Sequence, residues 1–345
     1  MPPLPRRELR KLVRKLGVAA RPAEQKNALA TLATLCRDAD SRSAIVAAGA
    51  IPDLVLLLGP VFSAGVHQDA AGTLINLATD DANRVAITAA GAIPPLVQLL
   101  GPATSAGMQQ GEAGALWSLS VNVANKITIA AAGAIPPLVQ LLGPGSSADV
   151  QREASGALRS LAVNDANKIT IAAAGAIPPL LQLLGAGSPP DVQGEAAGAL
   201  RNLAANAENM VTVAAGGAIP PLVQLLGRGS PSDVQREAAG VLKNLAANAE
   251  NRVAIAAAGA IPPLVQLLGH GPDDVQRDAA GALMNLAVNA ENAVTISAAG
   301  AVSALKELCG LALPSTRNGS HPKHWCCSAP AMTTAALHLA VGGQC

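Results

Sequence analysis

The sequence predicts an all-helical solenoid, and a repeated phrase is the main reason. The phrase GAIPPLVQLLG returns nearly unchanged along the chain, at intervals of 42 residues with one interval of 41. Its first glycines are Gly49, Gly91, Gly133, Gly175, Gly217, Gly259 and Gly300. A period of about 40–47 residues is typical of α-solenoids, whose units bury their apolar faces only against their neighbours. We therefore expect function to lie on an extended surface.

The composition suits thin helical layers and excludes several classes of partner. Half of the residues are apolar, but aromatic residues make up only 1%. The formal net charge is +1, so bulk electrostatics favour neither nucleic acid nor an anionic membrane, and aromatic platforms for stacking bases are scarce. The five cysteines are an odd number, and four lie beyond the regular repeats. This pattern favours a reducing compartment, the cytoplasm or the nucleus, over a disulfide framework.

One apolar segment has nearly the length of a membrane span. Residues 127–143 read ITIAAAGAIPPLVQLLG, with only Thr and Gln as polar interruptions. The same segment recurs in the other units, and each copy carries Gly and then Pro-Pro in its middle. Two short buried helices joined by a tight turn explain it better than a span of about 20 residues. The sequence therefore predicts no transmembrane segment.

The unit over residues 167–208 predicts three helices. A short first helix would have Asn167 as its N-cap and end at Gly175, the glycine expected just after a helix. Pro178 would lie in the first turn of a second helix, where its missing N–H costs little. Asp191 would cap a longer third helix, whose apolar residues recur at steps of three and four, as a core-facing stripe requires.

This succession of a short, a medium and a long helix resembles the armadillo repeat proteins. The matching residues are NKxxxxxxGAIPPLVQLL in the first two helices and EAAGALxNLA in the third. The resemblance covers about residues 5–313 and implies a right-handed armadillo α-superhelix. It divides the chain into a helical cap over 1–40, six repeats over 41–291, a partial seventh repeat over 292–313 and an irregular tail over 314–345. Within the family, the units are similar to those of vacuolar-protein-8-like and plant or algal armadillo scaffolds.

The resemblance implies that the third helices line a concave groove with an asparagine ladder. The ladder position holds Thr34, Asn76, Ser118, Ser160, Asn202, Asn244 and Asn285. A carboxamide has both donors and an acceptor, so it can bond the backbone of an extended peptide. Neighbouring helices lie about 8–10 Å apart and an extended chain advances about 3.3 Å per residue, so one ladder residue would meet every second or third peptide residue. The alternative is a solvated polar position.

Two neighbouring positions on the third helix are further candidates. The residues just before the ladder are Ile75, Trp117, Arg159, Arg201, Lys243 and Met284. Their three successive basic side chains favour an acidic or phosphorylated partner segment, with Trp117 as an aromatic anchor, unless they form only a solvated face.

A glycine column lies four residues before the ladder, at Gly72, Gly114, Gly156, Gly198, Gly240 and Gly281. It indicates either close approach of a partner backbone or tight packing between helices, and we favour packing. In the nuclear-import adaptors of the armadillo family this position is largely tryptophan, and acidic residues facing the groove are not evident here.

The sequence offers no support for catalysis or for a cofactor. It has no phosphate-binding glycine loop after a strand and no nucleophile elbow. His321, His324, Cys326 and Cys327 match no zinc pattern. We therefore predict a monomeric, non-enzymatic protein–protein interaction scaffold that binds an extended partner segment. The alternatives are an import-adaptor-like receptor, the substrate-recognition part of a ubiquitin ligase assembly, or a purely structural product with an undifferentiated groove.

Overall fold

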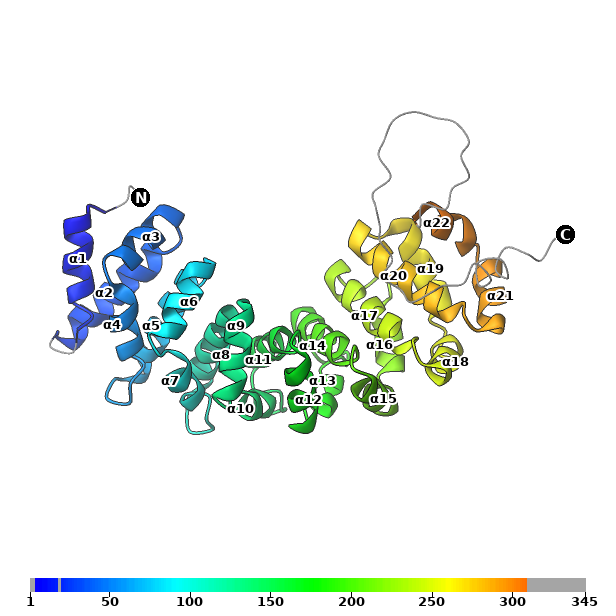
Figure 1. Ribbon diagram of the computed structural model, residues 1–345, viewed down its shortest axis with the longest axis horizontal. Helices are drawn as coiled ribbons and strands as arrows, with labels where there is room; N and C mark the ends of the chain where they lie inside the picture. The colour runs from blue at the N-terminus through cyan, green and yellow to red at the C-terminus, as the bar shows by residue number, and fades with distance from the viewer. Residues whose placement is uncertain (1–3, 18–19, 309–345) are drawn as a thin grey trace, which may run out of the picture. The chain divides into compact units, whose positions relative to one another are not determined.

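The computed structural model describes residues 4–17 and 20–308, and all of the regular elements in those residues are α-helices (Figure 1). The predicted all-α fold is therefore confirmed. No single helix in these ranges is both long and apolar enough to cross a membrane. The two consecutive helices Ala249–Ala257 and Ile261–His270 reach that length and composition together, but they meet at an angle of 83°.

The chain forms two compact units, Met1–Pro179 and Leu180–Cys345. In the first unit, α1 (Arg6–Arg14) and α2 (Pro22–Leu35) precede the repeats. The first helices of its repeats are α3 (Ala39–Ala47), α6 (Asp81–Ala89), α9 (Val123–Ala131) and α12 (Asp165–Ala173). The second helices are α4 (Ala50–Leu56), α7 (Ile93–Gln98) and α10 (Ile135–Gln140), and the third helices are α5 (Ala64–Leu77), α8 (Ala106–Ser120) and α11 (Ala148–Leu161).

The boundary between the two units lies within α13 (Ile177–Gln182), the second helix of its repeat. The second unit continues the same order of helices after α13. Its third helices are α14 (Pro190–Leu203), α17 (Ser232–Leu245) and α20 (Asp273–Leu286). Its first helices are α15 (Ala207–Ala215), α18 (Ala249–Ala257) and α21 (Ala290–Ala298). Its second helices are α16 (Ile219–Leu225), α19 (Ile261–His270) and α22 (Ala301–Leu308). Three helices per repeat are therefore present in both units.

The repeated glycine turns the chain between the first and second helices. All seven copies have positive φ values, from 79° to 86°. L side chains rarely adopt this left-handed conformation, so glycine is the residue that the turn requires. The predicted helix end at Gly175 is confirmed.

The predicted caps of the first and third helices lie a few residues away from the observed ones. Helix α12 begins at Asp165, and its N-cap is Asn164, whose side chain accepts the N–H of Asn167 at 3.1 Å. Helix α14 begins at Pro190, so Asp191 lies inside the first turn and accepts the N–H of Val192 at 3.0 Å. The prediction was wrong here because this helix starts one residue earlier, at Pro190. Proline has no backbone N–H, so it leaves no donor without an acceptor in the first turn.

Asn167 has a different task, because its buried side chain joins two repeats. Its Nδ2 donates to the carbonyl of Leu161, at the end of the preceding third helix, and to that of Lys126 on α9, both at 3.2 Å. Asn125 and Asn292 make the same pair of bonds one repeat before α12 and in the second unit. The bonds fix the register of one first helix against the next.

A glutamine near the start of the third helix ties it to the end of the second helix. Gln235 Nε2 donates to the carbonyl of Gly227 at 2.8 Å, and Gln193 and Gln151 make the equivalent bonds at 2.9 Å. In α5 the equivalent residue is His67, whose Nε2 lies 2.8 Å from the carbonyl of Gly59. The Gly227 carbonyl also accepts the N–H of Ser230 at 3.1 Å, and Gln235 adds a further bond to the carbonyl of Leu226 at 3.4 Å. The side chain therefore supplements the backbone bonds at the end of the short helix.

The Gln235→Ala variant should lower the free energy of unfolding by about 0.5–1.5 kcal/mol, because it removes the side-chain hydrogen bonds to the carbonyls of Leu226 and Gly227. Chemical denaturation measures this change. The matched control is Gln224→Ala on the exposed surface of α16, which should change the value by less than about 0.5 kcal/mol. Equal changes in the free energy of unfolding for the two variants would contradict a stabilising role of the Gln235 side chain.

Helix α8 contains a buried carboxyl group at a position where the following repeats have alanine. Glu112 is 0% exposed, and neither of its side-chain oxygens has a hydrogen-bond partner among the described residues. The equivalent residues of the next repeats are Ala154, Ala196 and Ala238. Burial raises the pKa of Glu112 from 4.5 to about 8, so the group is mainly protonated at neutral pH.

The free energy of unfolding should therefore fall as pH rises from about 4.5 to about 8. In this window Glu112 stays protonated in the folded state but is ionised in the unfolded chain. Stability is therefore highest at the acidic end of the window and falls as the pH rises through it. Thermal melts of the wild type and Glu112→Ala over this range check the prediction. The advantage of the variant should grow with pH, and a constant difference would contradict it.

Candidate functional site

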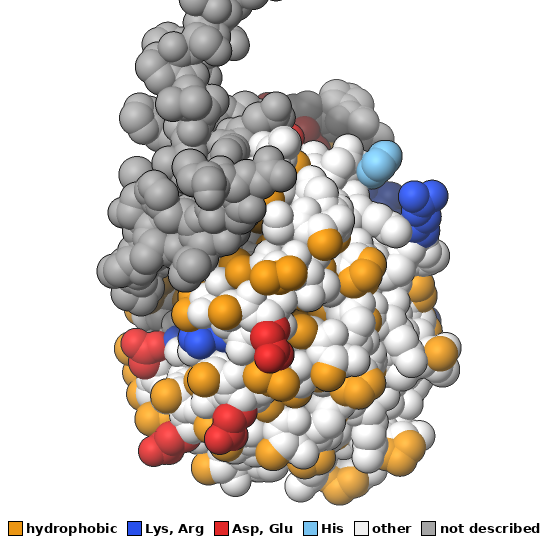
Figure 2. Space-filling model, turned by 90° about the vertical axis from the view of Figure 1, so that its right-hand side faces the viewer, with side chains coloured by type: hydrophobic (Ala, Val, Ile, Leu, Met, Phe, Trp, Pro, Cys, Tyr) orange, Lys and Arg blue, Asp and Glu red, His pale blue; other side chains and the backbone are white. Residues whose placement is uncertain are grey.

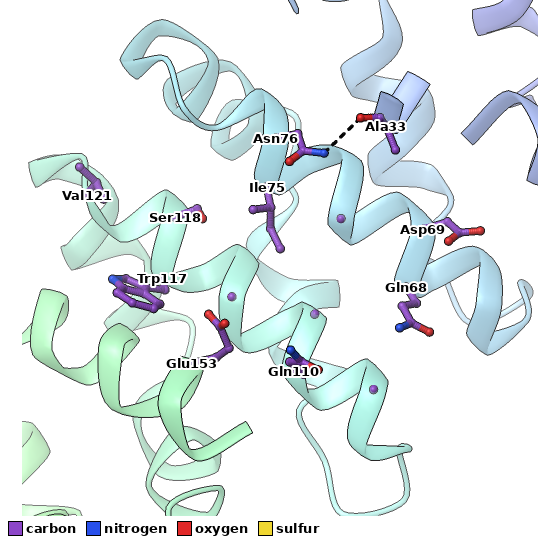
Figure 3. A pocket seen from close by; sticks show the side chains of 14 residues that line it. Ala33, Gln68, Asp69, Ile75, Asn76, Gln110, Trp117, Ser118, Val121 and Glu153 are labelled. Carbon is purple, nitrogen blue, oxygen red and sulfur yellow. Dashed lines mark hydrogen bonds between the residues drawn. The ribbon is translucent and has the colours of Figure 1, made fainter. Parts of the chain in front are cut away.

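A groove lies on the third helices of the first unit, the helices that carry the candidate binding residues (Figure 3). Its volume is ≈ 830 Å³, and its walls come mainly from α5 and α8, with Glu153 of α11 at one side. The ladder residues Asn76 and Ser118 and the candidate anchor Trp117 all line it. Four glycines, Gly72, Gly107, Gly111 and Gly114, also line the groove, so part of its surface is bare backbone. Such a surface allows an extended chain to approach closely.

The predicted binding residues all lie on third helices. In the first unit they are Asn76 on α5, Trp117 and Ser118 on α8, and Arg159 and Ser160 on α11. In the second unit they are Arg201 and Asn202 on α14, Lys243 and Asn244 on α17, and Asn285 on α20. Each of these side chains is partly exposed.

Several ladder side chains also bond the third helix of the preceding repeat. Asn244 Nδ2 and Asn285 Nδ2 donate to the carbonyls of Arg201 and Lys243, both at 2.9 Å. Asn76 makes the same bond to Ala33 at 3.4 Å, drawn as a dashed line in Figure 3. The shorter Ser160 bonds a different carbonyl: its hydroxyl donates to Ser120 at 2.9 Å, three residues beyond the equivalent position, Trp117. Each bond uses one donor, whereas a carboxamide has two N–H groups and an acceptor oxygen.

Three members of the glycine column, Gly156, Gly240 and Gly281, make room for the side chain that precedes the ladder on the preceding third helix, whereas a Cβ at Gly72 would meet nothing within 4 Å. A Cβ atom at Gly156 would lie 2.6 Å from the indole of Trp117, and one at Gly240 would lie 2.6 Å from Nε of Arg201. A Cβ at Gly281 would lie 2.5 Å from Cδ of Lys243. These contacts support the interpretation of the glycines as packing positions.

Acidic side chains do face this surface, contrary to the prediction from sequence. In the second unit, Arg201 forms ion pairs with Glu237 at 3.2 Å and with Asp278 at 2.9 Å. Lys243 pairs with the same Asp278 at 2.6 Å. The two carboxylates are nearly fully buried, and each lies seven residues before the ladder on its helix. Seven residues are about two helical turns, so this spacing was the signal that could have revealed them.

The groove of the first unit has a different charge pattern. Ile75 and Trp117 stand where the second unit has Arg201 and Lys243. Asp69 and Glu153 line the groove, and its lining includes no Lys or Arg. Glu153 forms an ion pair with Arg152 at 2.5 Å. The two units therefore present different chemistry on equivalent helices.

The described part of the chain also bears on the metal prediction. Within residues 4–17 and 20–308, no group of three or more His, Cys, Asp and Glu side chains could hold a metal ion. His321, His324, Cys326 and Cys327 lie outside the described residues, as does the tail over 314–345.

Comparisons with known proteins define the class to which this repeated fold belongs. The profile of the Armadillo/beta-catenin-like repeat matches residues 80–121, 122–163, 164–205, 208–247 and 248–288, more than half of the chain. The chain therefore belongs to the armadillo repeat family. No curated protein sequence matches it.

Solved structures of engineered armadillo proteins are similar to the chain. An engineered protein from the Northeast Structural Genomics Consortium has 35% sequence identity and a TM-score of 0.78, with 88% of this chain and 74% of that one covered. A designed armadillo repeat protein in complex with the peptide (KR)4 has 32% identity and a TM-score of 0.61, with 68% and 99% covered. Proteins computationally designed for modular peptide recognition have 29% identity and a TM-score of 0.62, with 68% and 99% covered.

The packing of the glycine column can be tested with a matched pair of variants. Gly156→Ala should lower the free energy of unfolding by about 1–3 kcal/mol, because the rigid indole of Trp117 must move. Gly281→Ala meets only the flexible chain of Lys243, and it gains about 0.5–1 kcal/mol of helix propensity, so it should be neutral or stabilising. Chemical denaturation of both variants measures the difference. Equal destabilisation would contradict the assigned contacts.

Proposed function

We propose that this protein is a non-enzymatic scaffold that binds an extended peptide segment of a partner protein along its third helices. The groove of the first unit carries the proposal, because it combines two ladder residues, an indole and a glycine-lined surface in one open site. The family and the similarity to a designed armadillo protein in complex with a peptide support the same kind of ligand.

The ladder would hold the peptide backbone. Asn76, Asn244 and Asn285 each donate one N–H to a neighbouring helix, and these bonds hold the side chain in place. The carboxamide oxygen and second N–H can then bond the N–H and C=O of an extended chain without further ordering. The internal bond thus prepares the ladder for binding.

The side chains of the ligand would meet different charges on the two units. On the first unit, Asp69 favours a basic residue of the peptide, and Trp117 offers an aromatic surface to it. On the second unit, an acidic or phosphorylated residue would compete with Glu237 and Asp278 for Arg201 and Lys243. A phosphate has the higher charge and more acceptor oxygens, so it is the stronger competitor.

The experiment is a peptide-library selection with the intact chain, followed by affinity measurement on the triple variant Asn76→Ser, Asn244→Ser and Asn285→Ser. Serine can still bond the preceding third helix, as Ser160 does through the carbonyl of Ser120, but its reach toward a ligand is shorter. Three lost peptide hydrogen bonds of about 0.5–1.5 kcal/mol each should weaken binding by tenfold or more.

The matched control for this triple variant is Asn164→Ser, which changes an N-cap of a first helix and should leave peptide affinity unchanged. Selected peptides that bind the triple variant as tightly as the wild type would exclude the ladder. A chain that selects no peptide at all would contradict the scaffold proposal itself.

A further inference from the structure

Six successive first helices, α6, α9, α12, α15, α18 and α21, carry an exposed aliphatic side chain at the equivalent position. In the second unit this column consists of Val211, Val253 and Val294, which are 56%, 55% and 71% exposed. In the first unit the equivalent residues are Val85, Ile127 and Ile169, each at least half exposed. Single exposed valines are ordinary, but such a column forms a regular apolar stripe.

Bonds between first helices place members of this column in register, from α18 to α21 in the second unit and from α6 through α9 to α12 in the first. Asn292 on α21 donates to the carbonyl of Arg252 on α18, and Arg252 directly precedes Val253. In the first unit Asn125 and Asn167 make the equivalent bonds to Arg84 and Lys126. Packed neighbouring helices lie about 8–10 Å apart, so successive members of the column are separated by a similar step. Seven residues of an α-helix advance about 10.5 Å, which matches that step.

Carboxylates accompany the stripe of the second unit. Glu208, Glu250 and Glu291 lie three residues before the three valines, hence on the same face of each helix, and all three are exposed. None of them forms a salt bridge within residues 4–17 and 20–308.

The one basic residue next to the valines of the second unit is turned away from the stripe. Arg252 donates to the carbonyls of Ala246 and Ala247 at 2.8 and 2.9 Å. On the surface that Figure 2 draws, hydrophobic side chains likewise lie in small groups with acidic ones among them.

The stripe of the first unit carries its own cations. Asp81 and Asp165 precede Val85 and Ile169 by four residues. Asp81 pairs with Arg84 at 3.4 Å, and Asp165 pairs with Lys168 at 2.6 Å. The carboxylates beside the stripe are thus paired with cations in the first unit, whereas those beside the stripe of the second unit form no salt bridge among the described residues. The aliphatic residues are spaced equivalently along the sequence in both units.

We propose that the Val211–Val253–Val294 stripe is a second interaction surface, which binds a basic amphipathic α-helix of a partner protein. The helix would lie across α15, α18 and α21, with an aliphatic residue at every seventh position against one valine. Lysines or arginines on one flank of that row would face Glu208, Glu250 and Glu291. Side chains on one face of an extended strand recur at steps of about 6.6 or 13 Å, whereas every seventh residue of a helix recurs at about 10.5 Å, so a row of side chains with a step of about 8–10 Å favours a helix. The exposed carboxylates select its basic charge.

The probe is a fluorescent 21-residue helical peptide with leucine at every seventh position and lysines along one flank of the leucines. A scrambled peptide of the same composition and a peptide with glutamates in place of the lysines serve as controls. The probe should bind the intact chain, weaken as salt rises, and bind at least tenfold more tightly than either control. Equal binding of the scrambled peptide would overturn the proposal.

The protein variant for this test is Val211→Thr, Val253→Thr and Val294→Thr, which changes exposed positions and keeps their shape. It should weaken probe binding about tenfold or more. The matched control is Val85→Thr, Ile127→Thr and Ile169→Thr, the same kind of change on the first unit, which should leave affinity within twofold. A larger loss of probe affinity in the first-unit variant than in the second-unit variant would overturn the proposal.

Two further measurements separate this surface from the groove and from self-association. The Asn244→Ser and Asn285→Ser changes should leave probe affinity unchanged, so failure of the groove proposal and failure of this one are distinguishable. Sedimentation analysis should show the same mass for the wild type and the valine variant. A wild type that dimerises and a valine variant that does not would show that a second copy occupies the stripe, and would overturn the proposal.

Discussion

The close approach of successive repeats is the constraint on which the rest of each unit depends. Side chains that reach from one repeat to backbone carbonyls of the previous one enforce it. Asn167 bonds Lys126 from a first helix, and Asn244 bonds Arg201 from a third helix, so both layers are fixed at the same time. A buried carbonyl without a partner costs about 1–3 kcal/mol, so a slip in register would lose several such bonds together.

The same constraint explains the composition of the third helices. Helices that approach this closely can accept only small residues where a neighbouring side chain crosses them. Gly156 lies under the indole of Trp117, and Gly240 lies under the guanidinium of Arg201. Each glycine costs about 0.5–1 kcal/mol in helix propensity relative to alanine. The contact that it permits places a large side chain at the candidate binding surface, which connects packing to function.

The two units use equivalent positions for different chemistry. Ile75 and Trp117 leave an open groove beside Asp69 in the first unit, whereas Arg201 and Lys243 are held by Glu237 and Asp278 in the second. Near-identical repeats therefore need not give an undifferentiated surface. A few substitutions on a common scaffold change the local charge and the local shape, and the regular backbone repeats the positions at which such changes act.

The sequence by itself determined the helices, the glycine turns and the core stripe, because these follow from local periodicity. The sequence alone shows the period of 42 residues, the glycine that ends the first helix at Gly175 and the apolar steps around Leu200. Only the tertiary structure decided what the polar columns do. The carbonyl bonded by Asn244 lies 43 residues away, and the partner of Arg201 at Asp278 lies 77 residues away. Such contacts depend on how neighbouring repeats stack, which a pattern within one repeat does not encode.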